Sequence, residues 1–175
     1  MKKVNLYVPK VEDLWFRQEC MSDPETMAYN AGYEVGFEGY HFDTGCIDFP
    51  KEKHQKWFDE KMSNPNFFYA YIQDQETNEF VGYVNFNVKE NKKASMGIVV
   101  HSKFKGQGYM RPVMQLLIEE AKKRGVKSLT DTVPNTRENA LRVFYDFGFE
   151  KVSEEIGKKF DREETIYEIE NKLEF

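Results

Sequence analysis

Three strand-like runs follow one another in the middle of the chain and limit the folds that it can adopt. The runs are FFYAYI (67–72), FVGYVNFNV (80–88) and ASMGIVV (94–100), all rich in aromatic or β-branched residues. The turn-forming stretches DQETNE and KENKK separate them, so we predict an antiparallel meander. A helical pattern at 112–124 comes next, and its apolar side consists of Met110, Val113, Met114, Leu117 and Ala121. An apolar strand that passes through a short glycine-containing stretch into a helix favours a mixed sheet with helices packed on it.

The rest of the chain alternates between the same two kinds of element. We predict strands near 3–8, 128–133, 149–156 and 164–170, and helices near 11–20, 51–62 and 136–147. A short helix is expected after Asp23, because Asp23 can cap it and Pro24 suits its first position. The segment 32–49 contains four glycines and has no period, which indicates a long loop. We therefore expect one domain over residues 1–175 with an α/β (α+β) fold.

Composition excludes several classes of protein. The chain has 175 residues, a net charge of −5 and a pI near 5.4. A general nucleic-acid-binding protein usually has a basic face, so this charge argues against one. Cys20 and Cys46 are too few for a disulfide framework and do not form a metal-binding motif, so no metal is expected. No segment approaches the ~18 apolar residues that span a bilayer. We expect a cytoplasmic protein, a monomer or a homodimer, with no nucleic-acid or membrane partner.

The stretch SKFKGQGYM (102–110) gathers positive charge around two glycines in an otherwise acidic chain. It joins a predicted strand to a predicted helix, and the free N–H groups at the start of a helix favour phosphate. Gly106 and Gly108 lack side chains and would let a bulky anion approach the backbone. We interpret the stretch as a phosphate or pyrophosphate cradle. A dinucleotide-binding fold would need a third glycine where Arg111 stands, and the Gly-Lys-Ser/Thr of a P-loop is missing.

These residues resemble the acetyl-CoA signature of the GNAT N-acetyltransferases, Gln/Arg-x-x-Gly-x-Gly/Ala. Here the signature reads KFKGQG (103–108), with lysine in its first position. The stretch NALRVFYDFGF (139–149) resembles the closing helix of the family and its Gly-Phe ending. Its LRV piece is most similar to the branch that includes ribosomal-protein N-terminal acetyltransferases. The resemblance covers about residues 65–170. It implies the GNAT fold: a twisted, mixed and mostly antiparallel sheet of about seven strands, flanked by helices on both faces.

The resemblance also implies that acetyl-CoA is the co-substrate. The backbone of Ile98, Val99 and Val100 would pair with the pantetheine amides, and one N–H group would polarise the thioester carbonyl. The residues expected at the pyrophosphate are Lys103, Lys105, Gly106, Gln107, Gly108, Tyr109, Met110 and Arg111. Asn135 and Asn139 are candidates for contacts with the pantetheine arm. The alternatives are a helix cap for Asn135 and an exposed helix position for Asn139.

Proton transfer has no obvious catalyst in this sequence. Many family members place a tyrosine four residues before the closing glycine, as an acid for the leaving thiolate. That position is Phe144 here, so Tyr145 is the candidate, and water or the substrate is the alternative. An amine must lose a proton before it attacks, yet no base can be identified. His101 follows the strand 94–100 directly, but a structural role in the turn is favoured for it.

The acceptor is expected to bind at the segment 29–49, where aromatic and acidic residues are mixed. Carboxylates and aromatic faces both attract an ammonium group. The candidates are Tyr33, Glu38, Tyr40, Asp43 and Asp48. The alternative is that the aromatic side chains pack the loop and the acids face water.

The leading hypothesis is therefore an acetyl-CoA-dependent N-acetyltransferase that acts on a primary amine, with a small molecule favoured as acceptor. Acetylation of a protein or peptide N-terminus is a second possibility, because of the LRV resemblance. A module that binds acyl-CoA without turnover is a third, because Phe144 has no proton to give. A structural protein without a cofactor would require the glycine stretch to be a simple turn.

Overall fold

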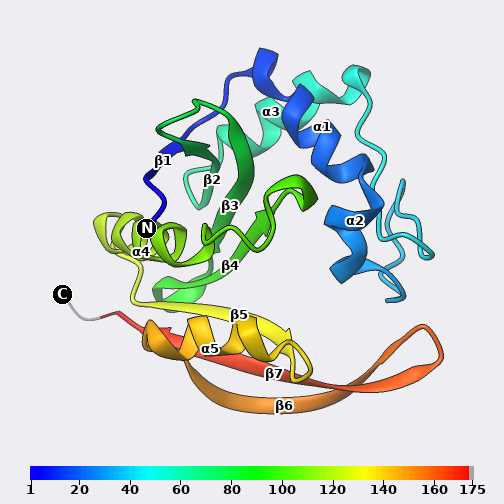
Figure 1. Ribbon diagram of the computed structural model, residues 1–175, viewed down its shortest axis with the longest axis vertical. Helices are drawn as coiled ribbons and strands as arrows, with labels where there is room; N and C mark the ends of the chain where they lie inside the picture. The colour runs from blue at the N-terminus through cyan, green and yellow to red at the C-terminus, as the bar shows by residue number, and fades with distance from the viewer. Residues whose placement is uncertain (174–175) are drawn as a thin grey trace.

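A seven-stranded sheet runs through the molecule in a computed structural model of the chain, which describes residues 1–173 (Figure 1). The strands are β1 (Val4–Tyr7), β2 (Phe67–Asp74), β3 (Phe80–Val88), β4 (Lys93–Val100), β5 (Ser128–Pro134), β6 (Glu150–Lys159) and β7 (Arg162–Lys172). Their order in the sheet is β1-β2-β3-β4-β5-β7-β6. All neighbours are antiparallel except β4 and β5, which confirms the predicted mixed and mostly antiparallel sheet.

The two parallel strands stay together over a short distance only. β4 and β5 pair from Lys93↔Ser128 to Ser95↔Thr130, and beyond these residues they part. β4 remains paired with β3 up to Val100, and β5 remains paired with β7 up to Pro134. The sheet therefore splits into two halves that are joined at one end and separate at the other, as Figure 1 shows.

Helices cover both faces of the sheet, as the sequence predicted. They are α1 (Trp15–Ser22), α2 (Pro24–Met27), α3 (His54–Met62), α4 (Met110–Lys123) and α5 (Glu138–Asp146). On one face, α4 and α5 bury an apolar stripe against the sheet in a large core that includes Leu117 and Phe144. On the other face, α1 and α3 cover an aromatic core that includes Phe16, Tyr69 and Tyr83.

The predicted elements are all present, with boundaries that differ by a few residues. α4 begins at Met110, two residues earlier than predicted, so Pro112 is its third residue. The Asp23 side chain accepts hydrogen bonds from the N–H groups of Glu25 and Thr26, as expected for the cap of α2. The segment 32–49 is an irregular loop with a single bridge between Tyr40 and Ile47. No helix within residues 1–173 has the length and apolar character needed to cross a membrane.

Candidate active site

The separation of β4 from β5 leaves one edge of β4 without a partner strand. Antiparallel pairs alternate between those that exchange hydrogen bonds and those that do not. His101 N–H bonds to Val81 O, and Lys89 N–H bonds to Lys93 O, which fixes this alternation along β3 and β4. The polar backbone groups of Val99 consequently point to β3. Those of Ile98 and Val100 point into the gap, where they can pair with an extended ligand.

The turn after β4 presents a second set of free backbone groups. Within residues 1–173, the N–H groups of Gly106, Gln107, Gly108 and Tyr109 donate to no acceptor, and no side chain caps the start of α4. Gly106 has a φ of 75° and Gly108 a φ of 87°, a conformation that other residues adopt only with strain. Free N–H groups at the start of a helix are suited to bind a phosphate.

Hydrogen bonds to other elements hold this turn in place. The Tyr109 side chain is buried, and its hydroxyl donates to Asp74 at the end of β2 over 2.5 Å. Lys105 Nζ donates to the carbonyl oxygen of Glu25 over 2.9 Å, which ties the turn to α2. Ser102 adds two bonds to the same helix, to the side chains of Asp23 and Thr26. The backbone of the turn is therefore preorganised.

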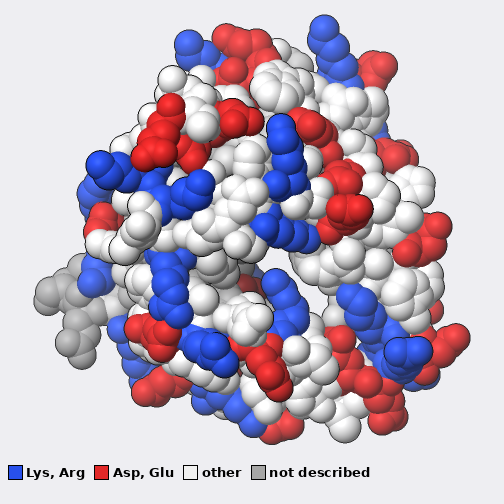
Figure 2. All heavy atoms as spheres, viewed as in Figure 1, with Lys and Arg blue, Asp and Glu red and all other residues white. Residues whose placement is uncertain are grey.

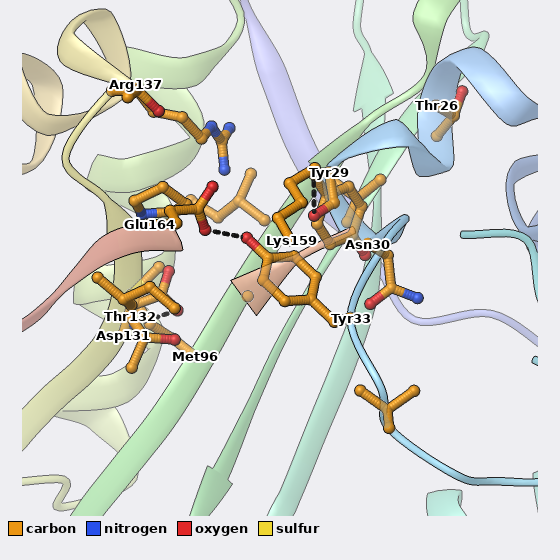
Figure 3. A pocket seen from close by; sticks show the side chains of 18 of the residues that line it. Thr26, Tyr29, Asn30, Tyr33, Met96, Asp131, Thr132, Arg137, Lys159 and Glu164 are labelled. Atoms are coloured by element: carbon orange, nitrogen blue, oxygen red, sulfur yellow. Dashed lines mark hydrogen bonds between the residues drawn. The ribbon is translucent and has the colours of Figure 1, made fainter. Parts of the chain in front are cut away.

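A cavity of about 1020 Å³ begins beside this turn and continues between the two halves of the sheet. Its wall includes Ile98 and Val100 of β4, Asp131 and Thr132 of β5, and Lys105. Figure 3 shows the wall formed by Met96, Asp131 and Thr132, with Tyr29, Asn30 and Tyr33 across from it. Figure 2 shows a hollow in the middle of this face, with Lys and Arg side chains at its rim.

The hairpin between β6 and β7 closes one side of the cavity. Phe160 at its tip donates a 2.7 Å backbone hydrogen bond to Gly32 O, and its ring packs on Phe42 with 5.4 Å between centroids. Lys159 Nζ donates to the carbonyl oxygens of Ala28 and Tyr29, at 3.1 and 3.4 Å. Further inside, the Tyr33 hydroxyl donates to the Glu164 carboxylate (Figure 3). The hairpin tip and the segment 28–42 thus form an arch over the cavity.

Asp131 is an unusual carboxyl group in this cavity. Burial raises its pKa to about 7, although the Thr132 N–H group, 2.8 Å away, and the positive charge of Arg137 oppose the rise. Burial therefore favours the neutral form of this carboxyl group. A group of this kind can give or take a proton during a reaction.

Comparisons with known proteins agree with this geometry. The model of the acetyltransferase (GNAT) family matches residues 33–149. The chain belongs to this family. It is an acetyltransferase whose co-substrate is acetyl-CoA, and the resemblance inferred from the glycine stretch is confirmed. A comparison of the sequence with curated proteins gave no match.

The solved structures similar to this acetyltransferase share its fold at low sequence identity. The spermidine N-acetyltransferase of Vibrio cholerae, in complex with CoA and spermine, superposes with a TM-score of 0.77 at 12% identity, over 95% of this chain and 94% of that one. YncA from Salmonella typhimurium, described as a candidate acetyltransferase and bound to acetyl-CoA, gives a TM-score of 0.73 at 14% identity, over 98% and 94%. At these identities the likeness shows the fold alone.

Within the acetyltransferase, most side chains of the predicted pyrophosphate turn point away from the free N–H groups. Arg111 forms a 2.8 Å ion pair with Asp146 of α5, and Lys103 lies 3.8 Å from Glu79. Gln107 Nε2 donates to Lys103 O, Tyr109 is buried, and Met110 packs against the core. The backbone of Gly106, Gln107, Gly108 and Tyr109 is what the turn offers to a ligand, and Lys105 is its one residue on the cavity wall.

Of the five residues predicted to contact the acceptor, one lies on the cavity wall. Tyr33 lines the cavity, but Glu38, Tyr40, Asp43 and Asp48 do not. The Tyr40 hydroxyl donates to the carbonyl oxygens of Asn30 and Tyr33, both at 2.7 Å, so it holds the loop together. Asp48 pairs with His41 at 2.8 Å on the surface, and Glu38 and Asp43 are exposed. The alternative of a loop packed by its aromatic residues, with acids in water, describes this segment better.

Three other candidates also lie outside the cavity wall. Asn135 and Asn139 are not part of the wall, and Asn135 does not cap α5, whose capping position is Arg137. Tyr145 is 43% exposed on α5, so its position does not suit an acid for a thiolate inside the cavity. His101 Nδ1 accepts a 3.2 Å bond from the Lys103 N–H group, which is the structural role favoured for it.

Sequence reasoning missed Asp131, Arg137 and Glu164. A signal existed for Asp131, because an acid stands inside the strand-like run SLTDTV, between the inward positions of Leu129 and Val133. No comparable signal marked the other two residues. Arg137 stands at the start of α5, directly after β5, and Glu164 lies on the β6–β7 hairpin, so only the tertiary structure places them on the cavity wall.

Proposed function

We propose that the enzyme transfers the acetyl group of acetyl-CoA to the primary amine of a small molecule that carries a single ammonium group. The observation that supports this most directly is the sequence of features from the free N–H groups of the turn, along the open edge of β4, to the cavity under the arch. A diphosphate, an extended amide-containing arm and an acyl end need these three features in this order.

The residues present fit the co-substrate. The N–H groups of Gly106, Gln107 and Gly108 would bind the pyrophosphate, and the backbone of Ile98 and Val100 would pair with the pantetheine amides. Acetyl-CoA supplies an acetyl group activated as a thioester. A free N–H group of β4 beside the thioester carbonyl would stabilise the negative charge that develops on its oxygen when the amine attacks.

The arch favours a small acceptor over a protein N-terminus. A polypeptide substrate needs an open groove, whereas the tip at Phe160 is hydrogen-bonded to Gly32 across the cavity. The charges of the wall argue against a polyamine, although the solved neighbours include spermidine N-acetyltransferases. The basic residues of the wall are Lys105, Arg137, Lys158 and Lys159, and the acidic ones are Glu34, Asp131 and Glu164. A polycation would meet more repulsion than attraction there, since burial favours the neutral form of Asp131 and Glu164 already accepts from Tyr33.

A panel of acceptors tests the proposal. We would measure CoA release from acetyl-CoA with monoamines, polyamines and peptides that have a free N-terminus. We expect a monoamine to give the highest kcat/KM, and release to be lost in Gly106→Glu. Highest activity with a peptide or a polyamine would overturn the proposed acceptor class.

A binding module without turnover is the second candidate, because Phe144 is buried and has no proton to donate. The same panel decides between the two. A protein that binds acetyl-CoA but releases no CoA with any acceptor would support the module.

A further inference from the structure

Phe144 stands in the position that carries a tyrosine acid in many family members, whereas Asp131 places a carboxyl group on the cavity wall. Thr130 is the last residue of β5 that pairs with β4, so Asp131 is the first residue beyond the point where the two strands part. Ser95 is the last paired residue of β4, and Met96, the next residue, lies on the cavity wall with Asp131 (Figure 3). Asp131 thus lies at the narrow end of the gap.

The acyl end of the co-substrate is expected at this narrow end. The phosphate turn follows Val100, and each strand residue advances the chain by about 3.3 Å. Met96 therefore lies about 13 Å farther along β4 than Val100, toward the narrow end. The thioester is at the opposite end of the pantetheine arm from the pyrophosphate. An arm that runs along the open edge consequently brings its sulfur toward Asp131.

Asp131 also lies on the side of the sheet where Phe144 packs. Strand residues alternate between faces, so Asp131 shares a face with Leu129 and Val133. Both of these residues belong to the core formed with α4 and α5, and so does Phe144. A carboxyl group at this place can reach a sulfur that lies between the strands.

We infer that Asp131 is the general acid that protonates the leaving thiolate, an assignment that rests on the proposed acetyl transfer. The amine nitrogen forms a bond to the carbonyl carbon and loses a proton to water, and the carbon–sulfur bond breaks with its electron pair moving to sulfur. The Asp131 O–H proton passes to that sulfur, which gives the CoA thiol and the Asp131 carboxylate. The ammonium that enters the next cycle, or water, returns a proton to the carboxylate.

The surroundings of Asp131 suit this cycle. The Thr132 N–H group and Arg137 at the start of α5 stabilise the carboxylate that forms, while burial favours the neutral acid. Tyr29 faces Asp131 from the segment after α2, and β4 and β7 present Met96 and Ile169, which do not titrate. The other titratable groups of the wall are Tyr33, Glu34, Tyr83, Lys105, Lys158, Lys159 and Glu164.

The first test is independent of the acceptor. The thiolate absorbance of bound CoA, with the desulfo-CoA complex as blank, gives the pKa of the bound thiol. We expect this pKa to be at least one unit higher in the wild-type protein than in Asp131→Asn, because a carboxylate beside the sulfur opposes its ionisation. Glu164→Gln removes a carboxylate from the same wall and is the matched control, with a thiol pKa equal to that of the wild type. An equal thiol pKa in wild type and Asp131→Asn would overturn the assignment.

The second test uses the best acceptor of the panel. We expect Asp131→Asn to lower kcat about 100-fold, a size typical of general acid catalysis. The wild-type kcat should fall as the pH rises above the pKa of the acid, and this limb should be lost in the variant. Equal kcat values would refute the assignment but leave the acetyl transfer intact. A protein that binds neither CoA nor desulfo-CoA would refute both.

Discussion

The hydroxyl of Tyr109 donates a 2.5 Å hydrogen bond to the carboxylate of Asp74, which lies 35 residues earlier in the chain. The bond connects the phosphate turn to the end of β2, which lies between β1 and β3 and whose side chains are mostly buried. It also lowers the pKa of Asp74, an effect that burial opposes and the N–H groups of Glu76 and Thr77 reinforce. The turn is thereby fixed to a buried strand of the sheet.

Tyr109→Phe should loosen the turn without unfolding the protein. Loss of a buried hydrogen bond to a charged group costs about 1–3 kcal/mol of unfolding free energy. We expect the Kd for acetyl-CoA to rise several-fold, as measured by calorimetry, because the free N–H groups lose their fixed positions. Tyr7→Phe removes a 2.7 Å bond from a tyrosine hydroxyl to Asp13, neither of which belongs to the turn, and serves as the control. A Kd that rises equally in both variants would contradict this role of Tyr109.

Alanine in place of Gly106 or Gly108 should weaken acetyl-CoA binding and lower the free energy of unfolding only slightly. A Cβ at either position meets no atom within 4 Å, so the cost is that of a positive φ, about 1–2 kcal/mol. We expect the Kd for acetyl-CoA to rise about tenfold, as the turn relaxes or the new methyl group blocks the ligand. Gly125→Ala is the matched control, because Gly125 has a φ of 76° and open space but lies at the end of α4. A similar Kd in all three variants would argue against the turn as the phosphate site.

Gly32→Ala should open the arch. A Cβ on Gly32 would lie 2.6 Å from the Phe160 ring and 2.8 Å from the Phe160 nitrogen, so the hairpin tip must move. Hydrogen exchange of the Phe160 amide should become faster, and the KM for the acceptor should rise while that for acetyl-CoA stays constant. Gly36→Ala has the same kind of positive φ without a collision and should behave as wild type. If Phe160 exchanges equally fast in both variants, the docking of the tip is not what closes the cavity.

Asp131→Asn should stabilise the protein in a pH-dependent way. Because the pKa of Asp131 is raised in the folded state, its contribution to stability is complete at low pH and is lost as the pH rises. The melting temperature of the variant should equal that of the wild type near pH 3.5, exceed it increasingly up to about pH 7 and keep a constant excess above. This excess in melting temperature corresponds to a gain of at most about 4 kcal/mol in the free energy of unfolding. A constant difference across this range would contradict the raised pKa.

The fold could be predicted from the sequence because each strand and helix has a recognisable local pattern of residues. The runs around Phe68 and Val84 alternate or stay apolar as strands in a core do, and the glycine stretch indicated the phosphate turn through its backbone chemistry. The acceptor side was predicted poorly, because its residues come together only through the arch. Tyr40 looked like a ligand group in the sequence, yet its hydroxyl is used by two carbonyl groups of its own loop. No pattern near Tyr109 pointed to Asp74, since tertiary structure alone brings them together.

Binding of acetyl-CoA by the backbone of the turn is tested most directly by an amide spectrum of the protein labelled with ¹⁵N-glycine, recorded with and without acetyl-CoA. We expect large shifts for Gly106 and Gly108 of the turn and for Gly97 on the cavity wall. Gly125 at the end of α4 should stay in place. If saturating acetyl-CoA leaves the chemical shifts of the Gly106 and Gly108 amides unchanged, the turn is not the site that binds the diphosphate.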